Sequence, residues 1–335
     1  MLRNFWYIGC ASSRLRNSPR ATKILDRDLV LFRDSNGQAH ALEDRCCHRG
    51  VRLSLGKITE GAIACRYHGW RYDGSGRCIH IPSLPSKHRL PESFGVTAFP
   101  TAEICGYVWV WMGDIQAISP PPELPDFLRH RWRQGAFSAR CNWMKMVENN
   151  VDWCHVVFAL EWTHPVFFIR LLRGPGEFNY EVRITETAMI TFTPPTINED
   201  DPIPDKVLAS FKFELPDRLE VRQYFGGKSG RGINLIAYFH FVPTTANSCR
   251  IEWMIPSVFP VGPRVSWSAR KPKILVQDKE LLESAQSWYD REGSDFEHSV
   301  ESDISQIAVR RLVERALQQN RTDRLPKRRV VRVRV

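Results

Sequence analysis

The sequence lacks the features that would place it among membrane, secreted or repetitive proteins. No apolar run in its 335 residues reaches the roughly 18 residues that a membrane-spanning helix needs. The N-terminus, MLRNFWYIGC, has neither an uninterrupted apolar stretch nor the small-residue cleavage site of a secretory signal. It also has no low-complexity block and no repeat of 20 to 50 residues. These absences predict a soluble, cytoplasmic globular protein.

Acidic residues are fewer than basic residues, and the number of cysteines is odd. The chain has 37 Asp and Glu against 47 Lys and Arg, which gives a formal net charge of +10, and seven bases lie in the last fifteen residues. Nine cysteines in a cytoplasmic chain of this size favour metal ligands over a disulfide framework. The basic charge favours an acidic protein partner. Nucleic acid is the rival partner, but no recognition motif accompanies the charge, so we expect none.

Turns and periodicity divide the chain into an α+β arrangement of two domains and a tail. Residues 1–115 consist of short strand-like runs, including a hairpin over residues 21–42 with the turn Asp-Ser-Asn-Gly. After the linker SPPPELP, residues 116–325 mix helix and sheet. Residues 326–335 form a basic tail, in which RVVRVRV also alternates like an edge strand.

The second domain shows both periodicities. Apolar residues recur at three- and four-residue spacing in three segments, which predicts helices over residues 142–159, 274–289 and 303–317. Between them, EVRQYF, INLIAYFHFV and SCRIEWMI have the composition of strands.

Two short segments offer thiols and imidazoles in equal number. Cys46 and His48 are separated by sixteen residues from Cys65 and His68, in the pattern C-x-H-x16-C-x2-H. Two sulfur and two nitrogen ligands suit either tetrahedral zinc or a [2Fe-2S] cluster in which His replaces Cys on one iron. The spacing alone leaves both metals open.

The residues around these ligands resemble the two cluster-binding loops of Rieske proteins. CCHRGVRLSLG and CRYHGWRYDGSGRC carry the glycine and aromatic positions of those loops. The resemblance implies a Rieske [2Fe-2S] cluster that relays single electrons, at a potential of roughly −150 to +300 mV. Cys47 is then a bystander. A zinc-stabilised binding protein is the alternative.

A further segment resembles the N-W-K…E-N-x-x-D-x-x-H motif of the Rieske non-heme iron oxygenases. Asn142-Trp143 and Glu148 to His155 match it, and QDKELLESAQ resembles the helix that supplies a carboxylate ligand in this family. The resemblance covers nearly the whole chain and is with the oxygenase (alpha) subunit of the vanillate-demethylase-like or pheophorbide-oxygenase-like branch. It implies an N-terminal all-β Rieske domain and a helix-grip (START/Bet v1-like) catalytic domain with an antiparallel sheet.

By this resemblance, mononuclear Fe(II) is bound by two His and one carboxylate, with His155 and Asp278 as two of the three ligands. The chain departs from the family pattern at the second His, because the residues four and five positions after His155 are Ala159 and Leu160. His164 follows, but on an unbroken helix it would face away from His155. Pro165 favours a break after about Phe158, which would let His164 turn back.

Glu161 is the alternative oxygen ligand at this position. A site that has lost its iron is the third possibility.

Asp152 precedes His155 by three residues, which would place both on one face of a helix. By resemblance, Asp152 bridges His155 to the cluster ligand His68 of a neighbouring subunit. This implies a ring of subunits, most often a homotrimer.

The implied function is that of a terminal oxygenase. An NAD(P)H-dependent flavin reductase, a ferredoxin or both would pass electrons to the cluster and then, through His68, Asp152 and His155, to the iron. There O2 would serve to hydroxylate, or to O- or N-demethylate, a small organic molecule that contains a ring. The alternatives are a cis-dihydroxylating dioxygenase and a non-catalytic Rieske electron-transfer protein with a vacant second metal site.

Overall fold

The computed structural model divides into two compact units, Arg3–Phe127 and Leu128–Val335. The structure describes residues 1–85, 88–114, 117, 120–121, 124, 132–159, 176–196, 198, 201–202, 207–226, 232–256, 273–318 and 328–334. No helix among these residues is long and apolar enough to cross a membrane.

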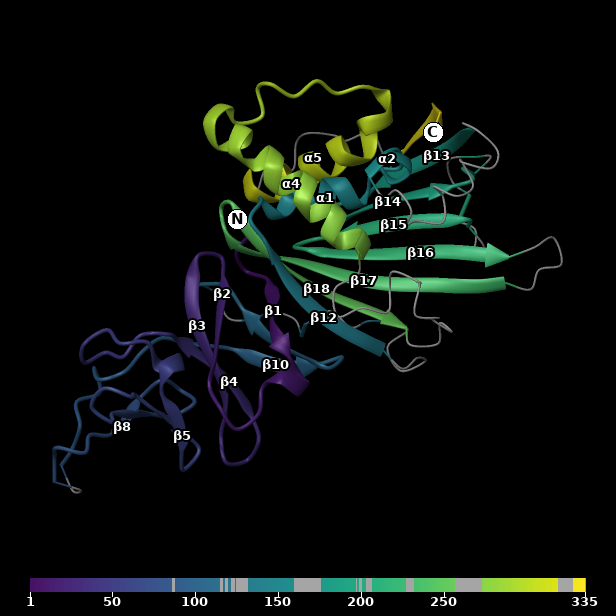
Figure 1. Ribbon diagram of the computed structural model, residues 1–335. Coiled ribbons are helices and arrows are strands. Elements are labelled where there is room, and N and C mark those ends of the chain that lie inside the picture. The colour runs from purple at the N-terminus through teal and green to yellow at the C-terminus, as the bar shows by residue number, and fades with distance from the viewer. Residues whose placement is uncertain are drawn as a thin grey trace. The chain divides into compact units, whose positions relative to one another are not determined.

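The first unit is built from short antiparallel strands in three sheets (Figure 1). One sheet contains, in order, β1 (Trp6–Ala11), β11 (Tyr107–Trp111) and β10 (Thr101–Ile104). The second contains β2 (Arg20–Ile24), β3 (Arg27–Arg33), β4 (Ala39–Glu43) and β9 (Ala98–Phe99). The third contains β5 (Lys57–Thr59), β6 (Ala62–Ala64), β7 (Arg71–Tyr72) and β8 (Cys78–His80). Single 3-10 turns lie at Ser12–Arg14 and Leu53–Leu55.

The predicted hairpin over residues 21–42 is present as β3 and β4, but the first of its two runs is itself divided into β2 and β3 by a turn at Leu25 and Asp26, which both have a positive φ. In β3 the apolar run from Leu29 to Phe32 is completely buried. The turn into β4 is closed by Asp34, whose Oδ1 accepts the backbone N–H groups of Asn36 and Gln38. Such a side-chain turn is the reason that Asp favours this position.

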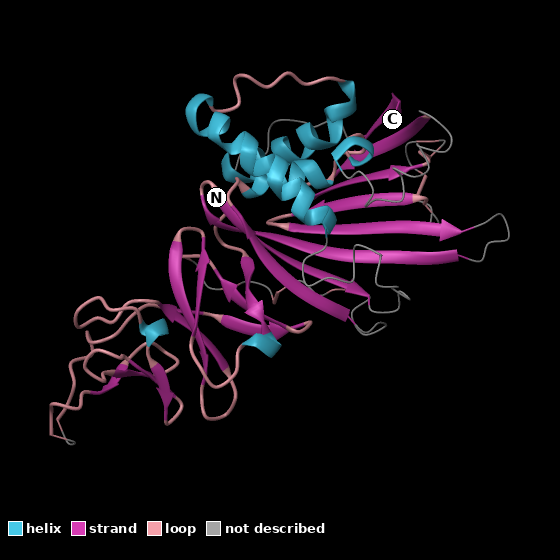
Figure 2. Cartoon of the chain, viewed as in Figure 1, coloured by secondary structure: helices cyan, strands magenta, loops and turns pink. Residues whose placement is uncertain are grey.

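The second unit contains one antiparallel sheet of eight strands, covered by helices on one face (Figures 1 and 2). The strands, in spatial order, are β12 (Trp132–Ala139), β18 (Ser248–Pro256), β17 (Gly232–Thr245), β16 (Arg218–Gly226), β15 (Ala209–Glu214), β14 (Ala188–Thr193), β13 (Glu177–Ile184) and β19 (Arg328–Arg334). The helices are α1 (Trp143–Asn150), α2 (Val156–Ala159), α4 (Lys273–Glu292) and α5 (Ile304–Gln318), with a 3-10 turn at Glu301–Asp303. The predicted α+β fold is confirmed.

The helices pack through the apolar stripe that the sequence predicts. In α5 the buried residues recur at three- and four-residue spacing: Ser305, Ala308, Val309, Leu312 and Val313. In α4, Leu275, Asp278 and Gln286 are buried on one face. A carboxylate is therefore held where an apolar residue would be expected.

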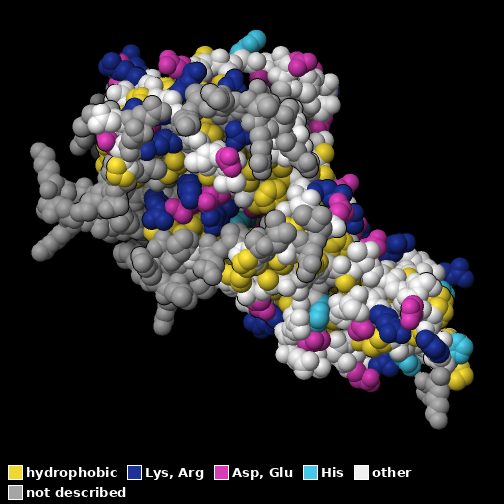
Figure 3. Space-filling view, turned by 180° about the vertical axis from the view of Figure 1, so that it is seen from behind, with side chains coloured by type: hydrophobic (Ala, Val, Ile, Leu, Met, Phe, Trp, Pro, Cys, Tyr) yellow, Lys and Arg dark blue, Asp and Glu magenta, His cyan; other side chains and the backbone are white. Residues whose placement is uncertain are grey.

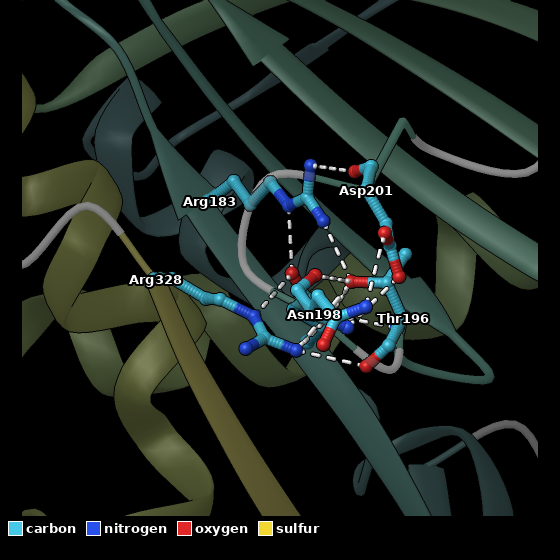
Figure 4. A network of polar contacts seen from close by, with 6 residues as sticks. Arg183, Thr196, Asn198, Asp201 and Arg328 are labelled. Carbon is cyan, nitrogen blue, oxygen red and sulfur yellow. Dashed lines mark hydrogen bonds and ion pairs between the residues drawn. The ribbon is translucent and has the colours of Figure 1, made fainter.

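The basic C-terminal segment is part of the sheet. β19 pairs antiparallel with β13, and its Val331 and Val333 are buried while Arg332 and Arg334 are exposed. Figure 4 shows Arg328 and Arg183 converging on this edge. Both guanidinium groups bind the carboxylate of Glu181, which is completely buried, at 2.9 and 2.6 Å.

The face of the molecule seen in Figure 3 carries Lys and Arg side chains interspersed with Asp and Glu. Strand alternation accounts for the exposure of Arg332 and Arg334.

Candidate metal centres

The two predicted cluster loops have the same backbone design. After β4, the N–H of Cys46 donates to Val51 O at 2.9 Å, and the N–H of Gly50 donates to Cys46 O at 2.9 Å. Between β6 and β7 the N–H of Cys65 donates to Trp70 O at 2.8 Å, and that of Gly69 to Cys65 O at 3.0 Å. Each loop is thus a tight turn that opens at the cysteine and closes at a glycine four residues later.

Both closing glycines have a φ of +73°. Glycine adopts this left-handed conformation without the steric cost that a Cβ imposes. The turn chemistry therefore explains why each ligand segment ends in His-Arg-Gly or His-Gly.

The two imidazoles lie side by side. The ring centroids of His48 and His68 are 4.7 Å apart, and His48 stacks on Trp70 at 4.4 Å with an interplanar angle of 3°. The ring centroid of Tyr67 lies 3.9 Å from that of His68. Two planar neighbours thus fix the orientation of both rings.

His48 has the properties of a ligand. Burial, with His68 and Arg49 nearby, lowers its pKa, which favours the neutral ring that binds metals. Its Nδ1 is buried and has no hydrogen-bond partner among the described residues. A buried ring nitrogen without a partner is costly unless a bound group satisfies it. The site therefore fits a metal beside this ring.

The two predicted thiol ligands are buried, with Cys46 at 3% and Cys65 at 4% exposure. Burial raises the pKa of Cys65, and Cys46 lies within hydrogen-bonding reach of it. The hydroxyl of Tyr72 lies 3.0 Å from Cys46 Sγ and 3.3 Å from Cys47 Sγ. Two thiols and two imidazoles, each pair drawn from both loops, fit a [2Fe-2S] cluster with one pair on each iron.

The segment predicted as one helix over residues 142–159 is divided by a turn. Asn142 caps α1 by accepting the N–H of Met144 at 2.8 Å. The helix ends at Asn150, and the carboxylate of Asp152 accepts the N–H of Cys154 at 2.7 Å. This local hydrogen bond competes with the helical pattern. Asp152 and His155 therefore lie in a turn, not on a helical face as the spacing predicts.

The turn nevertheless brings the two side chains together. His155 Nδ1 lies 3.1 Å from the carbonyl oxygen of Asp152 and 3.6 Å from its Oδ2. On the other side of the ring, Nε2 lies 3.6 Å from Asp278 Oδ1 and 3.4 Å from Asn149 Nδ2. The ring is thus oriented by Asp152 and faces the buried carboxylate of α4.

The side chains of His155 and Asp278 together offer donor atoms for a metal ion. Asp278 is 1% exposed, and its Oδ1 has no hydrogen-bond partner among the described residues. Burial lowers the pKa of His155, but Asp152 and Asp278 outweigh it and raise that pKa to about 9. An imidazole nitrogen and a carboxylate oxygen are two of the three donors that a two-His, one-carboxylate iron site uses. The residues fit that group.

Both candidates for the third donor, His164 and Glu161, lie outside the described residues. Within the described part of the chain, no three His, Cys, Asp or Glu side chains are grouped closely enough to hold one ion. The ligand roles, including that of Asp152 toward a neighbouring His68, remain predictions.

Sequence reasoning missed two residues that shape these sites. Tyr72 contacts the thiols, and Trp153 anchors the turn between Asp152 and His155 to the sheet. The available signals were the position of Tyr72 four residues after His68 and the presence of an aromatic residue inside the motif.

Family models match both units. Residues 5–100 match the Rieske [2Fe-2S] domain, and residues 139–319 match the vanillate O-demethylase oxygenase C-terminal domain.

Two curated relatives illustrate the similarity. The putative toluene-4-sulfonate monooxygenase system iron-sulfur subunit TsaM2 of Comamonas testosteroni is 33% identical over 229 residues, which cover 67% of this chain and 64% of the relative. The oxygenase component of dicamba O-demethylase from Stenotrophomonas maltophilia is 35% identical over 163 residues, or 47% of each chain. The chain thus spans less than two thirds of the length of these relatives.

Among solved structures, dicamba monooxygenase bound to dicamba aligns with a TM-score of 0.78 and 22% identity, over 96% of this chain and 99% of that one. At this identity the likeness concerns the fold, and the helix-grip arrangement that the sequence predicts is confirmed.

Proposed function

The chain belongs to the Rieske non-heme iron oxygenases of the vanillate O-demethylase type, and on this premise we propose that it is the terminal oxygenase component of a multi-component system. It uses O2 and electrons from an NAD(P)H-dependent reductase to hydroxylate, or to O- or N-demethylate, a small organic molecule. One observation carries the proposal: His155 faces the buried, unsatisfied carboxylate of Asp278 while Asp152 holds the other side of its ring.

When bound, the cluster supplies one-electron transfer and the mononuclear iron supplies O2 activation. In the chain, Cys46 and Cys65 would hold one iron of the cluster, and His48 and His68 would hold the other. The mononuclear iron is held by three further side chains: His155, Asp278 and either His164 or Glu161.

Asp152 acts as an orienting residue. By engaging His155 Nδ1 through its carbonyl and carboxylate, it turns Nε2 toward Asp278. A carboxylate or carbonyl that accepts the second N–H of a ligating His fixes its tautomer and raises its basicity. In the assembled protein the same carboxylate binds His68 of the next subunit in a homotrimer.

The electron donor is an acidic ferredoxin, a flavin reductase or both. The formal charge of +10 supports such a partner, because opposite charges steer the encounter of redox proteins. We place this system in the cytoplasm, with no nucleic-acid or membrane partner.

The substrate is a ring compound, and the reaction is a monooxygenation. The names of the relatives support this choice, since they include a toluene-4-sulfonate monooxygenase and a dicamba O-demethylase. A demethylation needs no different residues, because hydroxylation of a methyl group on oxygen or nitrogen releases it as formaldehyde.

A non-catalytic electron carrier is the second candidate. It is favoured by one observation, the leucine at position 160 where the family pattern has a histidine.

Metal analysis separates the two candidates. The oxygenase predicts about three irons and about two acid-labile sulfides per chain, and a Rieske-type electron paramagnetic resonance (EPR) signal after reduction with dithionite. Loss of about one iron in His164→Ala, but not in Glu161→Ala, would identify the third ligand. About two irons in the wild type after anaerobic iron supplementation would instead establish the electron carrier.

A further inference from the structure

A buried network of charged side chains joins the three helices around the proposed iron site. It consists of Lys145 and Glu148 on α1, Tyr289 on α4, Glu297 in the following segment, and Arg310 on α5. The four charged side chains are 9% to 24% exposed. Two positive and two negative groups are thus enclosed together.

Each charged group in the network has at least two partners. Arg310 binds both carboxylate oxygens of Glu148, at 2.9 Å each, and donates to Glu297 at 2.6 Å. Lys145 donates to Glu297 at 2.6 Å and to Glu148 at 3.2 Å. The hydroxyl of Tyr289 donates to Glu297 at 2.7 Å, and Lys145 lies 4.3 Å from the centre of its ring. Two-pronged arginine bonds fix orientation as well as distance.

A second connection holds the start of α1 against α4. Gln286 accepts the backbone N–H of Asn142 at 2.7 Å, and Glu283 accepts that of Arg140 at 2.6 Å. Together with the charge network, these bonds restrict the sliding of α1 along its own axis and its rotation about that axis, both relative to α4.

Two backbone hydrogen bonds connect the end of α1 to the residues before His155. The N–H of Val151 donates to Val147 O at 3.1 Å, and that of Asp152 to Asn149 O at 3.2 Å. Asp152 then holds the imidazole of His155. On the opposite side, Asp278 belongs to the same helix as Gln286 and Tyr289. The separation of His155 Nε2 from Asp278 Oδ1 therefore depends on how α1 and α4 are held together.

We propose that Glu148 and Arg310 are positioning residues for the mononuclear iron: their ion pair joins α1 to α5 and, through Glu297 and Tyr289, to α4, and it thereby sets the spacing of His155 and Asp278. The inference rests on the proposed function. Buried ion pairs add little net stability compared with apolar residues of similar volume. A defined geometry at the metal is therefore the better account of this network than stability alone.

The test is the affinity of the full, cluster-loaded chain for Fe(II) after a chelator has removed iron from the second site. Arg310→Lys keeps the charge but loses the two-pronged bond, and we expect its affinity for Fe(II) to fall by about 10- to 100-fold. The EPR signal of the Fe(II)–nitric oxide adduct should broaden, while the signal of the reduced cluster should stay unchanged.

Arg328→Lys is the matched control, because it makes the same change at an arginine that binds a different buried carboxylate, that of Glu181 on β13. Its Fe(II) affinity should equal that of the wild type. Equal affinity in Arg310→Lys and the wild type, or an equal loss in the two variants, would overturn the proposal.

If Arg310→Lys does not fold, Tyr289→Phe removes only the hydroxyl bond to Glu297, and a several-fold loss of affinity is then the expected result. Wild-type affinity in that variant would count against the inference. A wild type that binds no Fe(II) at the second site would contradict the proposed function itself, so the two failures are distinguishable.

Discussion

Trp153 fastens the turn that carries His155 to the sheet. Its indole N–H donates to Thr191 Oγ1 at 2.8 Å. Its ring lies against three aromatic side chains of the sheet, at centroid distances of 4.8 to 5.7 Å: Phe178, Tyr180 and Phe211. Trp153 therefore contributes to holding the turn against the sheet.

We predict that Trp153→Phe lowers the free energy of unfolding by about 1–3 kcal/mol, because it leaves the buried Thr191 hydroxyl unpaired and removes apolar contacts. Thr191→Val is the companion variant, since it leaves the indole N–H unpaired instead. Denaturant titration measures both. If Trp153 positions His155, only Trp153→Phe should also weaken Fe(II) binding, and an effect on stability alone would limit Trp153 to packing.

In the first unit, the hydroxyl of Tyr72 contacts the sulfur of Cys46, one of the two predicted thiol ligands of the cluster. A hydroxyl that donates to a cysteine ligand stabilises the added negative charge of a reduced cluster. Tyr72→Phe should therefore lower the cluster potential, by about 40 mV if the bond contributes about 1 kcal/mol. Protein-film voltammetry gives the value. Cys47→Ala is the control, because it leaves the contact between Tyr72 and Cys46 in place, and an equal shift in both variants would argue against the assignment.

At the scale of the element, Glu181 joins β13 to β19. Burial disfavours its charge, but hydrogen bonds from Arg328, Arg183 and Thr196 outweigh burial and lower its pKa to about 2. One carboxylate thus fastens a strand that is more than a hundred residues away in sequence.

We predict that Glu181→Gln destabilises the protein by about 3 kcal/mol at neutral pH, because two guanidinium groups lose their partner in a buried site. Glu177→Gln on the same strand removes an exposed ion pair with Arg332 and should cost less than about 1 kcal/mol. Urea titrations of the two variants check the difference, and similar values would contradict it.

The same carboxylate predicts how stability depends on acid. Its folded pKa is about 2 and its ordinary value is 4.5, so its contribution is fully present above about pH 4.5. The contribution is lost as the pH falls from there toward about 2. Glu297 has the same direction of shift, also to about 2, because Lys145, Tyr289 and Arg310 outweigh its burial. Unfolding free energies between pH 5 and 3 should therefore fall less steeply in Glu181→Gln than in the wild type.

At the scale of the molecule, the sequence predicts well what is local. The strands β16, β17 and β18 follow from composition, and the helices α4 and α5 follow from periodicity. The cluster loops follow from residues within five positions of each cysteine, because their hydrogen bonds close within the loop. Asp278 was found only by resemblance, since a buried carboxylate has no periodic signal.

What the sequence does not predict depends on long-range contacts. The ion pair of Glu148 with Arg310 joins residues 162 positions apart, and the bond of Glu181 with Arg328 joins residues 147 apart. The break of the helix before His155 depends on a single side-chain bond of Asp152, which periodicity cannot detect.

Charge over the whole molecule gives a further prediction. If opposite charges steer an acidic electron donor to this basic chain, kcat/KM for the donor should fall by about tenfold as ionic strength rises from low to several hundred millimolar. Stopped-flow reduction of the cluster measures this dependence. Reduction by a small uncharged donor should be insensitive to salt, and an equally insensitive reaction with the protein donor would rule out steering.

The arginines of β19 also oppose the addition of a strand from another molecule to the sheet. β19 is an outermost strand of the described sheet, and an outermost strand presents unpaired N–H and C=O groups to which the strand of another molecule can add. Arg329, Arg332 and Arg334 are exposed along it, and a second copy would have to bring like charges against them. The basic end of the chain thus keeps the open edge of the sheet from seeding aggregates.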